Sequence, residues 1–582
     1  MPDPWGGDRP EADKVEALAK HLRDVWSQTR EKMRLVDAYK GGTFSVWRDA
    51  LDKRPAYHPP TARYLIDHAV DTQMSVDPKV KKFPAGEGDE HKKKADAVEP
   101  ALTAVMLDAA LKEPSIPWRQ AYSHMLAYGY SVMGTEWEEV GGLVAPKRLD
   151  GEEEKAYEAR MEQYEAGRVG WNPVRIKAPH PSRVLMNPNE MQPDLAIVES
   201  HRYAQDLANL VKRKGRYGSK RVKPYEPGDN PYKPVPLVEV FTAQWHGLKV
   251  KEDGDFLVVE RSPWGFMPWM HGFAGWGGEV TEVESEGFDP KHMAVSMLEG
   301  IIGPGALLQV QAQKASSIHN AVLERGYARL GTSLPSEEAA QQLEAGPEAV
   351  LQGTREDWWW LEYPEIRDWV FKSQQNDDRE IELATYIRQV VGEHQAGVTT
   401  LGQTMIYDQS ASRKFYVPAK QIERMAGIIG RNILKMVDIR GEPITLQGHK
   451  LRPSDIEGSY DVSVLFVQVN PVTQMEMRKL GMQEVGAGLK SPETYRESDA
   501  MMENEAEESK RLMKARIRER DDVQEQLQIN TIREEGLVQL ADRLQEALDA
   551  RIKGTGPVQA APVAGNGAAP AEMVPPVQTG GR

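Results

Sequence analysis

Residue types that often carry out enzymatic chemistry occur in this chain without the spacing that such chemistry requires. The chain has no cysteine, which excludes disulfides, cysteine nucleophiles and thiolate-bound zinc or iron–sulfur centres. Gly300, Gly303 and Gly305 form a glycine-rich stretch, but no Lys-Ser/Thr pair follows, so the stretch is not a phosphate-binding P-loop. Residues 129–133 begin like a nucleophile elbow, but Met133 stands where glycine is required. We therefore expect no catalytic residue of these classes.

The histidines and carboxylates also lack the spacing of a metal site. His394 follows Glu393, yet no second histidine lies four residues on, so a zinc-binding helix is not formed. The 13 histidines are scattered along the chain, and most carboxylates fall on charged helical faces, where solvation is their ordinary role. We expect no metal and no cofactor. A catalytic pair built from distant positions is the alternative that motif spacing leaves open.

A basic cluster between residues 212 and 223 could contact a polyanion. Its members are Lys212, Arg213, Lys214, Arg216, Lys220, Arg221 and Lys223. The whole chain, however, has 73 Lys+Arg against 88 Asp+Glu and a net charge of −15, whereas tight nucleic-acid binding usually needs a basic excess. A solvated or subunit-facing loop is therefore favoured over a nucleic-acid contact.

Three consecutive tryptophans, Trp358, Trp359 and Trp360, are the second cluster that could bind a partner. Neighbouring residues on a strand face opposite ways, so the three indoles cannot share one small core. At least one should be exposed or covered by a partner, where tryptophan is a favoured anchor. Packing within the small unit itself is the alternative.

Length and hydropathy limit the architecture that must position these residues. A chain of 582 residues is too long for one hydrophobic core. Its most apolar run, 298–310, is broken by glycine and proline and is shorter than the roughly 20 residues of a membrane span. The N-terminus lacks the charged and apolar regions of a signal peptide. We expect a soluble, multi-part chain without a membrane segment.

Periodicity predicts an α+β first half. The predicted helices are 11–38, 61–76, 95–111 and 118–128, with a charged helical insertion at 151–168. The predicted strands are 130–138, 174–176, 183–186, and a hairpin of 237–245 with 256–260. Residues 263–278, rich in Gly, Pro and Trp, are predicted to form a loop.

The second half is predicted to be dominated by long helices. The predicted elements are a helix at 305–330, a small mixed unit at 331–372, helices at about 374–395 and 413–439, a strand at 460–469 and a helical end at 492–552. Residues 397–412 are polar without apolar periodicity and are predicted to form a loop, and residues 553–582 are predicted to be disordered. Two long helices separated by a small unit predict an antiparallel stalk with a tip.

This order of elements resembles the portal proteins of tailed bacteriophages. Residues 122–137 (YSHMLAYGYSVMGTEW) resemble the helix, glycine and strand that enter the family's wing, and residues 181–189 (PSRVLMNPN) are similar to a wing segment ending in a turn. Residues 397–414 (GVTTLGQTMIYDQSASRK) look like the stretch that leads into the channel helix, and residues 460–471 resemble the strand returning to the wing. The resemblance covers residues 12–552.

The resemblance implies a portal fold, mainly helical α+β, with wing, stem, clip, channel helix and crown. The implied parts are 1–304 (N-terminal helices and wing), 305–330 (first stem helix), 331–372 (clip), 373–396 (second stem helix), 397–412 (tunnel loop), 413–440 (channel helix), 441–490 (wing return), 491–552 (crown) and 553–582 (tail). The family assembles as a ring of twelve copies, which a head-to-tail interface produces when it closes.

The resemblance also implies a function and partners. The ring would conduct double-stranded DNA at one capsid vertex during packaging and ejection, binding it weakly and without sequence preference, and would catalyse no reaction. The implied DNA-channel residues are Thr399, Thr400, Gln403, Thr404, Arg413, Lys414 and Arg424, and the implied partner-binding residues of the clip are Trp358, Trp359, Trp360 and Tyr363. The implied partners are the terminase, the head–tail adaptor, and the major capsid and scaffolding proteins. The implied location is the virion, after assembly in the host cytoplasm.

Two alternatives remain open at the level of sequence. One is another virion structural protein, such as a tail or minor capsid component that also uses long helices. The other is a metal-dependent nuclease or hydrolase that uses dispersed Asp and Glu residues.

Overall fold

The computed structural model divides the chain into two units, residues 1–468 and residues 469–582, each of which is described by itself. The described residues are 11–44, 57–74, 77–138, 153–167, 169–216, 221–251, 255–277, 290–302, 306–326, 330–333, 335, 358–360, 368–385, 401–466, 479, 481–487, 526, 528–530, 532–533 and 538–552. Helices and strands are mixed, as the predicted α+β class requires.

The predicted N-terminal helix is two helices, α1 (Ala12–Val25) and α2 (Ser27–Gly41). The break falls at Trp26, whose side chain is only 2% exposed and donates a hydrogen bond from Nε1 to the Met186 carbonyl oxygen (2.8 Å). Burying this indole against the sheet fixes the chain direction there, a tertiary effect that helical periodicity does not report.

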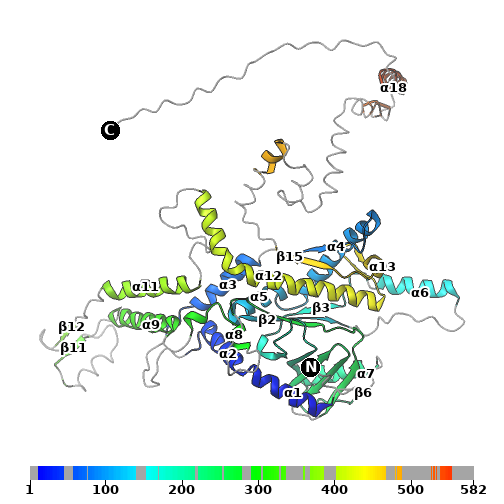
Figure 1. Cartoon of the computed structure of the whole chain (residues 1–582). Helices are drawn as coiled ribbons and strands as arrows, with labels where there is room; N and C mark the ends of the chain where they lie inside the picture. The colour runs from blue at the N-terminus through cyan, green and yellow to red at the C-terminus, as the bar shows by residue number, and fades with distance from the viewer. Residues whose placement is uncertain are drawn as a thin grey trace, which may run out of the picture. The chain divides into compact units, whose positions relative to one another are not determined.

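A three-stranded antiparallel sheet, in the order β10-β2-β3, forms the centre of the first unit (Figure 1). Its strands are β2 (Tyr130–Trp137), β3 (Val174–Lys177) and β10 (Trp269–Phe273). Helix α5 (Pro117–Tyr128) leads into β2 through Gly129, which has a φ of +69°. A Cβ at Gly129 would lie 2.3 Å from the Val295 carbonyl oxygen, so only glycine fits this turn. The helix, glycine and strand were predicted; β10 was not, because its sequence was interpreted as loop.

A six-stranded antiparallel sheet, in the order β4-β5-β7-β8-β9-β6, lies in the same unit. Its strands are β4 (Val184–Met186), β5 (Leu195–Tyr203), β6 (Arg221–Val222), β7 (Pro234–Thr242), β8 (Trp245–Val250) and β9 (Phe256–Arg261). The predicted pairing of 237–245 with 256–260 is wrong, because β8 lies between β7 and β9. The Thr242 hydroxyl accepts hydrogen bonds from the backbone N–H groups of Gln244 and Trp245 (3.3 and 2.8 Å), which makes a tight turn without glycine or proline.

Apart from the arm and the long helix described below, the other elements of this unit include strands from both ends of its sequence. They are α3 (Thr61–Gln73), β1 (Lys79–Lys82), α4 (Asp89–Leu111), α6 (Glu154–Gly167), η1 (Pro181–Arg183), α7 (Ala204–Arg216), α8 (Pro290–Met293), η2 (Glu299–Ile301), β13 (Ile444–Leu446), β14 (His449–Leu451), α13 (Pro453–Ile456) and β15 (Val462–Leu465). Strand β15 pairs antiparallel with β1, so the predicted late strand returns to the N-terminal body.

Helix α4 begins six residues before the predicted start. Its first turns carry His91 and Lys94, and both side chains lie 2.7 Å from the carboxylate of Glu457, which follows α13. The charged side chains of this turn are thus paired with Glu457, which helps to explain why the helix begins before the apolar periodicity at residue 95.

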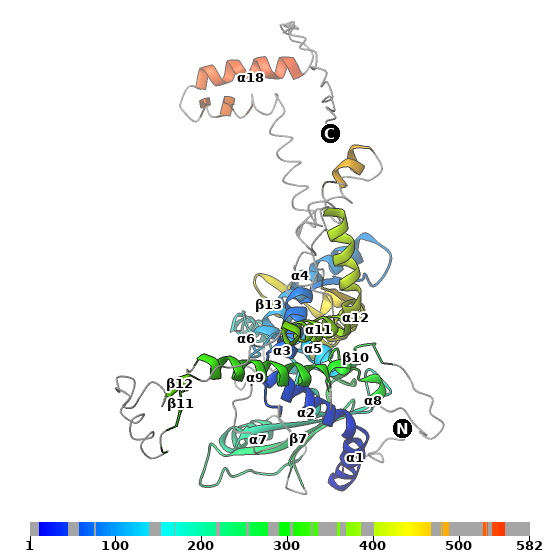
Figure 2. The ribbon, with the colours of Figure 1, turned by 90° about the vertical axis from the view of Figure 1, so that its left-hand side faces the viewer.

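Two helices and a strand pair form an arm, which we define as α9 (Leu307–Gly326), β11 (Leu330–Thr332), β12 (Trp358–Trp360) and α11 (Asp368–Thr385). The helices lie side by side and lead to the antiparallel pair β11–β12 (Figures 1 and 2). The antiparallel stalk with a tip is therefore present, with α11 starting at residue 368 rather than 374. Residues 386–400 lie outside the described part.

The longest described helix, α12 (Leu401–Arg440), contains 40 residues and is about 60 Å long at 1.5 Å per residue. Pro418 lies inside it, and its two halves run in different directions in Figure 1, as expected where proline removes a helical hydrogen bond. The helix predicted at 413–439 rests on an apolar stripe at helical spacing, and the buried position of that stripe is confirmed. Its residues are all at most 1% exposed: Ile422, Met425, Ile429, Ile433, Met436 and Val437.

In the second unit, α18 (Val538–Ile552) packs against residues 526–533. Ala541 and Leu548 are buried with Ile529, and the amides of Gln526 and Gln545 bond to each other. In the predicted helical end, Leu537, Leu540, Leu544 and Leu548 recur at helical spacing and predict one buried stripe. This is only partly correct, because Leu540 and Leu544 are exposed and Leu548 is buried. Leu537 and the predicted disordered tail lie outside the described residues.

Candidate functional site

Polar contacts hold the two helices of the arm together. Lys314 of α9 lies 2.7 Å from the Asp377 carboxylate and donates to the Ser373 hydroxyl (2.9 Å), both on α11. Gln311 of α9 donates to the Asp378 carboxylate (2.7 Å). Rising numbers on one helix meet falling numbers on the other, so the helices are antiparallel. Such pairs fix direction and register, while apolar burial here is limited to residues such as Ala312 and Ile381.

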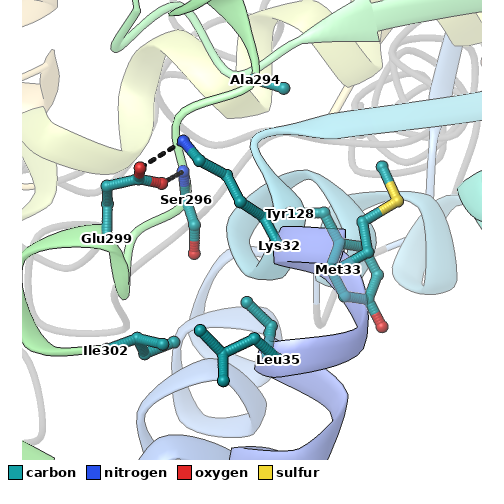
Figure 3. Close-up of a pocket in the computed structure, with 9 residues that line it drawn as sticks. Lys32, Met33, Leu35, Tyr128, Ala294, Ser296, Glu299 and Ile302 are labelled. Carbon is teal, nitrogen blue, oxygen red and sulfur yellow. Dashed lines mark hydrogen bonds and ion pairs between the residues drawn. The ribbon is translucent and has the colours of Figure 1, made fainter. Parts of the chain in front are cut away.

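Helix α9 of the arm is bonded to the N-terminal part of the chain. The Ser316 hydroxyl of α9 accepts from the Tyr57 backbone N–H (2.7 Å) and donates to the Tyr57 carbonyl oxygen (2.9 Å). Just before α9, Glu299 forms an ion pair with Lys32 of α2 at a small cavity of about 120 Å³ that Tyr128 also lines (Figure 3). The arm is therefore fixed at its base to the body of the first unit.

The tip of the arm leaves an indole exposed. Trp359 is 46% exposed, and the residue opposite it across the strand pair is Gly331, which has no side chain to cover it. This agrees with the prediction that at least one of the three indoles would not be buried. The side chains of Trp358 and Trp360, and the whole of Tyr363, lie outside the described residues.

The start of α11 adds aromatic surface that the sequence analysis did not assign. Trp369 is 63% exposed and Phe371 44% exposed. Their spacing of two was a usable signal, because residues two apart do not share one face of a helix.

The predicted DNA-channel residues fall mainly on α12. Gln403 and Thr404 lie in its first turn and Arg413 and Lys414 further along it, although none of their side chains is described, and Arg424 is exposed on the second half. Thr399 and Thr400 lie outside the described residues. The predicted loop at 397–412 is wrong from Leu401 onward, because helix propagates cooperatively from the buried half through a stretch that contains good helix formers such as Leu401, Met405 and Ala411.

Next to Arg424, a buried carboxylate joins α12 to the end of β15. Glu423 accepts a hydrogen bond from the Phe466 backbone N–H (3.0 Å) and pairs with Lys420 (2.5 Å). The second half of α12 is thus held by polar contacts as well as by its apolar stripe.

The basic cluster is partly helical rather than a loop. Residues 212–216 form the end of α7, and Ala204, Leu207 and Val211 of the same helix are buried. Arg221 is on the edge strand β6, and Lys223 lies 3.8 Å from Asp255. Basic residues in the last turn of a helix interact favourably with the helix dipole. The side chains of Arg213, Lys214, Arg216, Lys220 and Arg221 lie outside the described residues.

A cleft of about 510 Å³ was not predicted; we call it the inter-sheet cleft. It is lined by both sheets, by residues 262–264 and by Arg440 at the end of α12. Charged side chains from six strands line it, and we call them together its floor. They form the contacts Lys177–Glu136 (2.5 Å), Arg202–Glu239 (3.6 Å), His246–Glu239 (3.8 Å), His246–Glu260 (2.8 Å) and Arg175–Glu138 (2.7 Å).

The ion pairs in the cleft determine the ionisation states of His246 and Glu239. Burial would lower the pKa of His246, but the Glu239 and Glu260 carboxylates on either side raise it to about 9. Burial likewise opposes ionisation of Glu239, yet His246, Lys177 and Arg202 lower its pKa to about 2. At neutral pH both groups are charged, and each of the four carboxylates in the cleft has a cation beside it.

No group of three or more His, Asp or Glu residues suited to hold a metal ion occurs within the described ranges. In that same part of the chain, every helix is too short or too polar to cross a membrane.

No known protein family matches this chain, and no curated protein matches its sequence significantly. The function therefore has to be argued from the arm, α12 and the cleft themselves.

Proposed function

We propose that this chain is a portal protein of a tailed bacteriophage, one subunit of a closed ring that conducts double-stranded DNA into and out of the capsid. The observation that carries the proposal is the succession of the arm and α12. Two antiparallel helices with a two-stranded tip are followed by a 40-residue helix, and the chain then returns to the N-terminal body through β15. This is the order of stem, clip, stem, channel helix and wing that the portal family uses.

The surface of the arm supports an assembled state. Trp359, Trp369 and Phe371 of the arm are 46%, 63% and 44% exposed. Large aromatic side chains are favoured anchors of protein interfaces. In this proposal the tip binds the terminase and later the head–tail adaptor, and the body meets capsid and scaffolding proteins.

Charge supports weak, sequence-independent contact with DNA. The chain carries a net charge of −15, and each neutralised phosphate strengthens DNA binding and its dependence on salt. We assign the few phosphate contacts to Arg413, Lys414 and Arg424 of α12, and the uncharged contacts to Thr399, Thr400, Gln403 and Thr404. A DNA channel must let its cargo slide, which a strongly basic lining would prevent.

The first experiment is to measure the assembly of the purified full-length chain by mass photometry and negative-stain imaging. We expect closed rings with a central hole and a mass of about 780 kDa, twelve times the 65.3 kDa chain. Trp359 lies on the tip, outside the helices of the arm, and is assigned to partner binding rather than to ring closure. The variant Trp359→Ala should therefore still form rings.

A monomer or dimer that persists across protein concentration and salt would overturn the proposal. It would favour the other virion proteins that use long helices, or a hydrolase. A hydrolase would show turnover that depends on divalent metal and is lost on substitution of a carboxylate.

A further inference from the structure

Helix α11 of the arm has one side that faces α9 and one side that is exposed. The residues of the first side are buried or half-buried and recur at helical spacing: Val370, Ser373, Gln374, Asp377, Asp378 and Ile381. The contacts of Lys314 with Ser373 and Asp377, and of Gln311 with Asp378, show that this stripe faces α9. The exposed residues between 369 and 380 are two aromatic ones, Trp369 and Phe371, and otherwise polar or charged ones.

The two aromatic side chains lie at opposite borders of the exposed side. Successive residues of an α-helix are about 100° apart around its axis. Trp369 and Phe371 are therefore about 200° apart, one on each side of the half-buried Val370. The exposed residues Lys372 and Arg379 fall between them, on the side of α11 that points away from α9.

The arm consequently has two broad faces, each of which spans both helices (Figures 1 and 2). We call them the Trp369 face and the Phe371 face, after the aromatic residue at the border of each. At 1.5 Å rise per residue and a helix diameter of about 10 Å, a broad face of the arm offers on the order of 500 Å². That is a large part of the roughly 800 Å² that each partner contributes to a stable protein interface.

The position of the two rings favours a contact on each broad face over one contact on the outer side. A partner that covered the outer side of α11 would meet Lys372 and Arg379 before either ring. Tryptophan is a favoured anchor of interfaces, and aromatic residues are enriched in their cores. Covering both rings therefore needs two contacts, on opposite faces of the same arm.

A second and a third copy of this chain meet that need. Head-to-tail assembly joins two different surfaces of one chain, whereas a two-fold dimer would use one face twice and leave the other ring exposed. The hydrogen bonds between Ser316 of α9 and Tyr57 attach the arm to the N-terminal part of the chain. Each copy therefore presents its two faces in the same orientation, as a repeating contact requires.

We propose that the arms of neighbouring copies pack on each other, with the Trp369 face of one copy against the Phe371 face of the next. Trp369 and Phe371 are then the aromatic anchors that hold the ring together, and Trp359 at the tip is left for other partners. This inference rests on the proposed ring and identifies a contact within it.

The test compares the full-length variants Trp369→Ala and Phe371→Ala with the unmodified chain by sedimentation velocity, at a concentration at which the unmodified chain forms rings. We expect each variant alone to lose the rings, since removal of an aromatic anchor weakens every subunit contact by about thirtyfold. Trp359→Ala removes another exposed indole from the same arm and is the matched control, which should assemble like the unmodified chain. Circular dichroism should show all three variants folded, because the three side chains are exposed.

An equimolar mixture of Trp369→Ala and Phe371→Ala tests the pairing of the two faces. The mixture restores one intact contact, between the Trp369 face of the Phe371→Ala copy and the Phe371 face of the Trp369→Ala copy. The outer faces of such a pair are both impaired, so growth stops there. We expect heterodimers of about 130 kDa, twice the 65.3 kDa chain, and the appearance of heterodimers also shows that both variants are folded.

The outcomes separate this inference from the proposed function. If the unmodified chain forms rings and both variants form them equally well, the arm contact is wrong and the portal function stands. Loss of rings without heterodimers in the mixture would refute the pairing of the two faces, and an equal loss in Trp359→Ala would refute the assignment to Trp369 and Phe371. An unmodified chain that stays monomeric would overturn the ring and the arm contact together.

Discussion

The second half of α12 and the arm are both long and helical, yet they are stabilised in opposite ways. The stripe of α12 from Ile422 to Val437 is at most 1% exposed and packs into the main core. The arm has polar contacts such as Lys314–Asp377 between its helices, and its aromatic residues Trp359 and Trp369 are largely exposed. The second half of α12 is stabilised by burial within the chain, whereas the arm has aromatic surface that the single chain leaves exposed.

This difference suits the second half of α12 to a structural role and the arm to an interface. Apolar burial at about 25 cal/mol per Å² makes the α12 half a fixed part of the body. The largely buried pair Lys314–Asp377 adds little net stability, because desolvation offsets its attraction, so the arm is free to gain stability from partners.

The largest effect is expected in the core half of α12. Ile433 is fully buried, so Ile433→Ala should lower the free energy of unfolding by about 2–5 kcal/mol, because it removes packed methyl groups and leaves a cavity. Ile439, 47% exposed on the same helix, is the matched control, and Ile439→Ala should cost less than about 0.5 kcal/mol. Urea unfolding of both variants measures the difference. Equal losses would mean that position on the helix face does not decide stability here.

A pH-dependent effect of on the order of 3 kcal/mol is expected from the floor of the cleft. The pKa of His246 is raised from 6.5 to about 9, so its contribution is fully present below pH 6.5 and is lost as the pH rises through about 9. The pKa of Glu239 is lowered from 4.5 to about 2, so its contribution is present above pH 4.5 and is lost as the pH falls toward 2. Unfolding measured from pH 6 to 10 should show a fall in stability that His246→Gln flattens. Parallel curves for the two proteins would contradict the assignment to His246.

A smaller effect, about 1–3 kcal/mol, is expected at the polar contact between α12 and β15. Glu423→Ala leaves the buried Phe466 N–H without an acceptor, whereas Glu423→Gln keeps one. The alanine variant should lose stability and show faster hydrogen exchange at the Phe466 amide, and the glutamine variant should keep most of both. If the glutamine variant lost as much as the alanine variant, the charge of Glu423 rather than its hydrogen bond would be responsible.

Elements with local periodicity were predictable from sequence. The buried stripe of α12 follows the helical repeat, and the passage from α5 through Gly129 into β2 is marked by a glycine that the turn requires. Strand β8 was missed because the turn before it is made by the Thr242 hydroxyl and carries no glycine or proline. The helix start at Leu401 was missed because polar side chains were taken as evidence of a loop.

The inter-sheet cleft could not be predicted from local sequence patterns. Its floor assembles Glu136, Lys177, Glu239 and His246 from four strands, separated by up to about a hundred residues of sequence. Each of them is, in its own strand, an ordinary polar residue on an alternating pattern. Only the pairing of β8 with β7 and β9 brings His246 between two carboxylates, and no spacing rule reports it.

The smallest effect on stability is expected at the tip of the arm. Trp359→Ala should change the free energy of unfolding by less than about 0.5 kcal/mol, because the indole is 46% exposed and Gly331 opposite it offers no side chain to pack against. Trp26→Ala is the matched substitution in the body, and should cost about 3–5 kcal/mol, since that indole is buried and hydrogen-bonded to Met186. Urea unfolding of the two variants compares the regions directly. A cost above about 1 kcal/mol for Trp359→Ala would show that the Trp359 indole is already packed within the single chain. The contrast between a body stabilised by its own core and an arm stabilised by partners would then be wrong at Trp359, the residue on which it depends most.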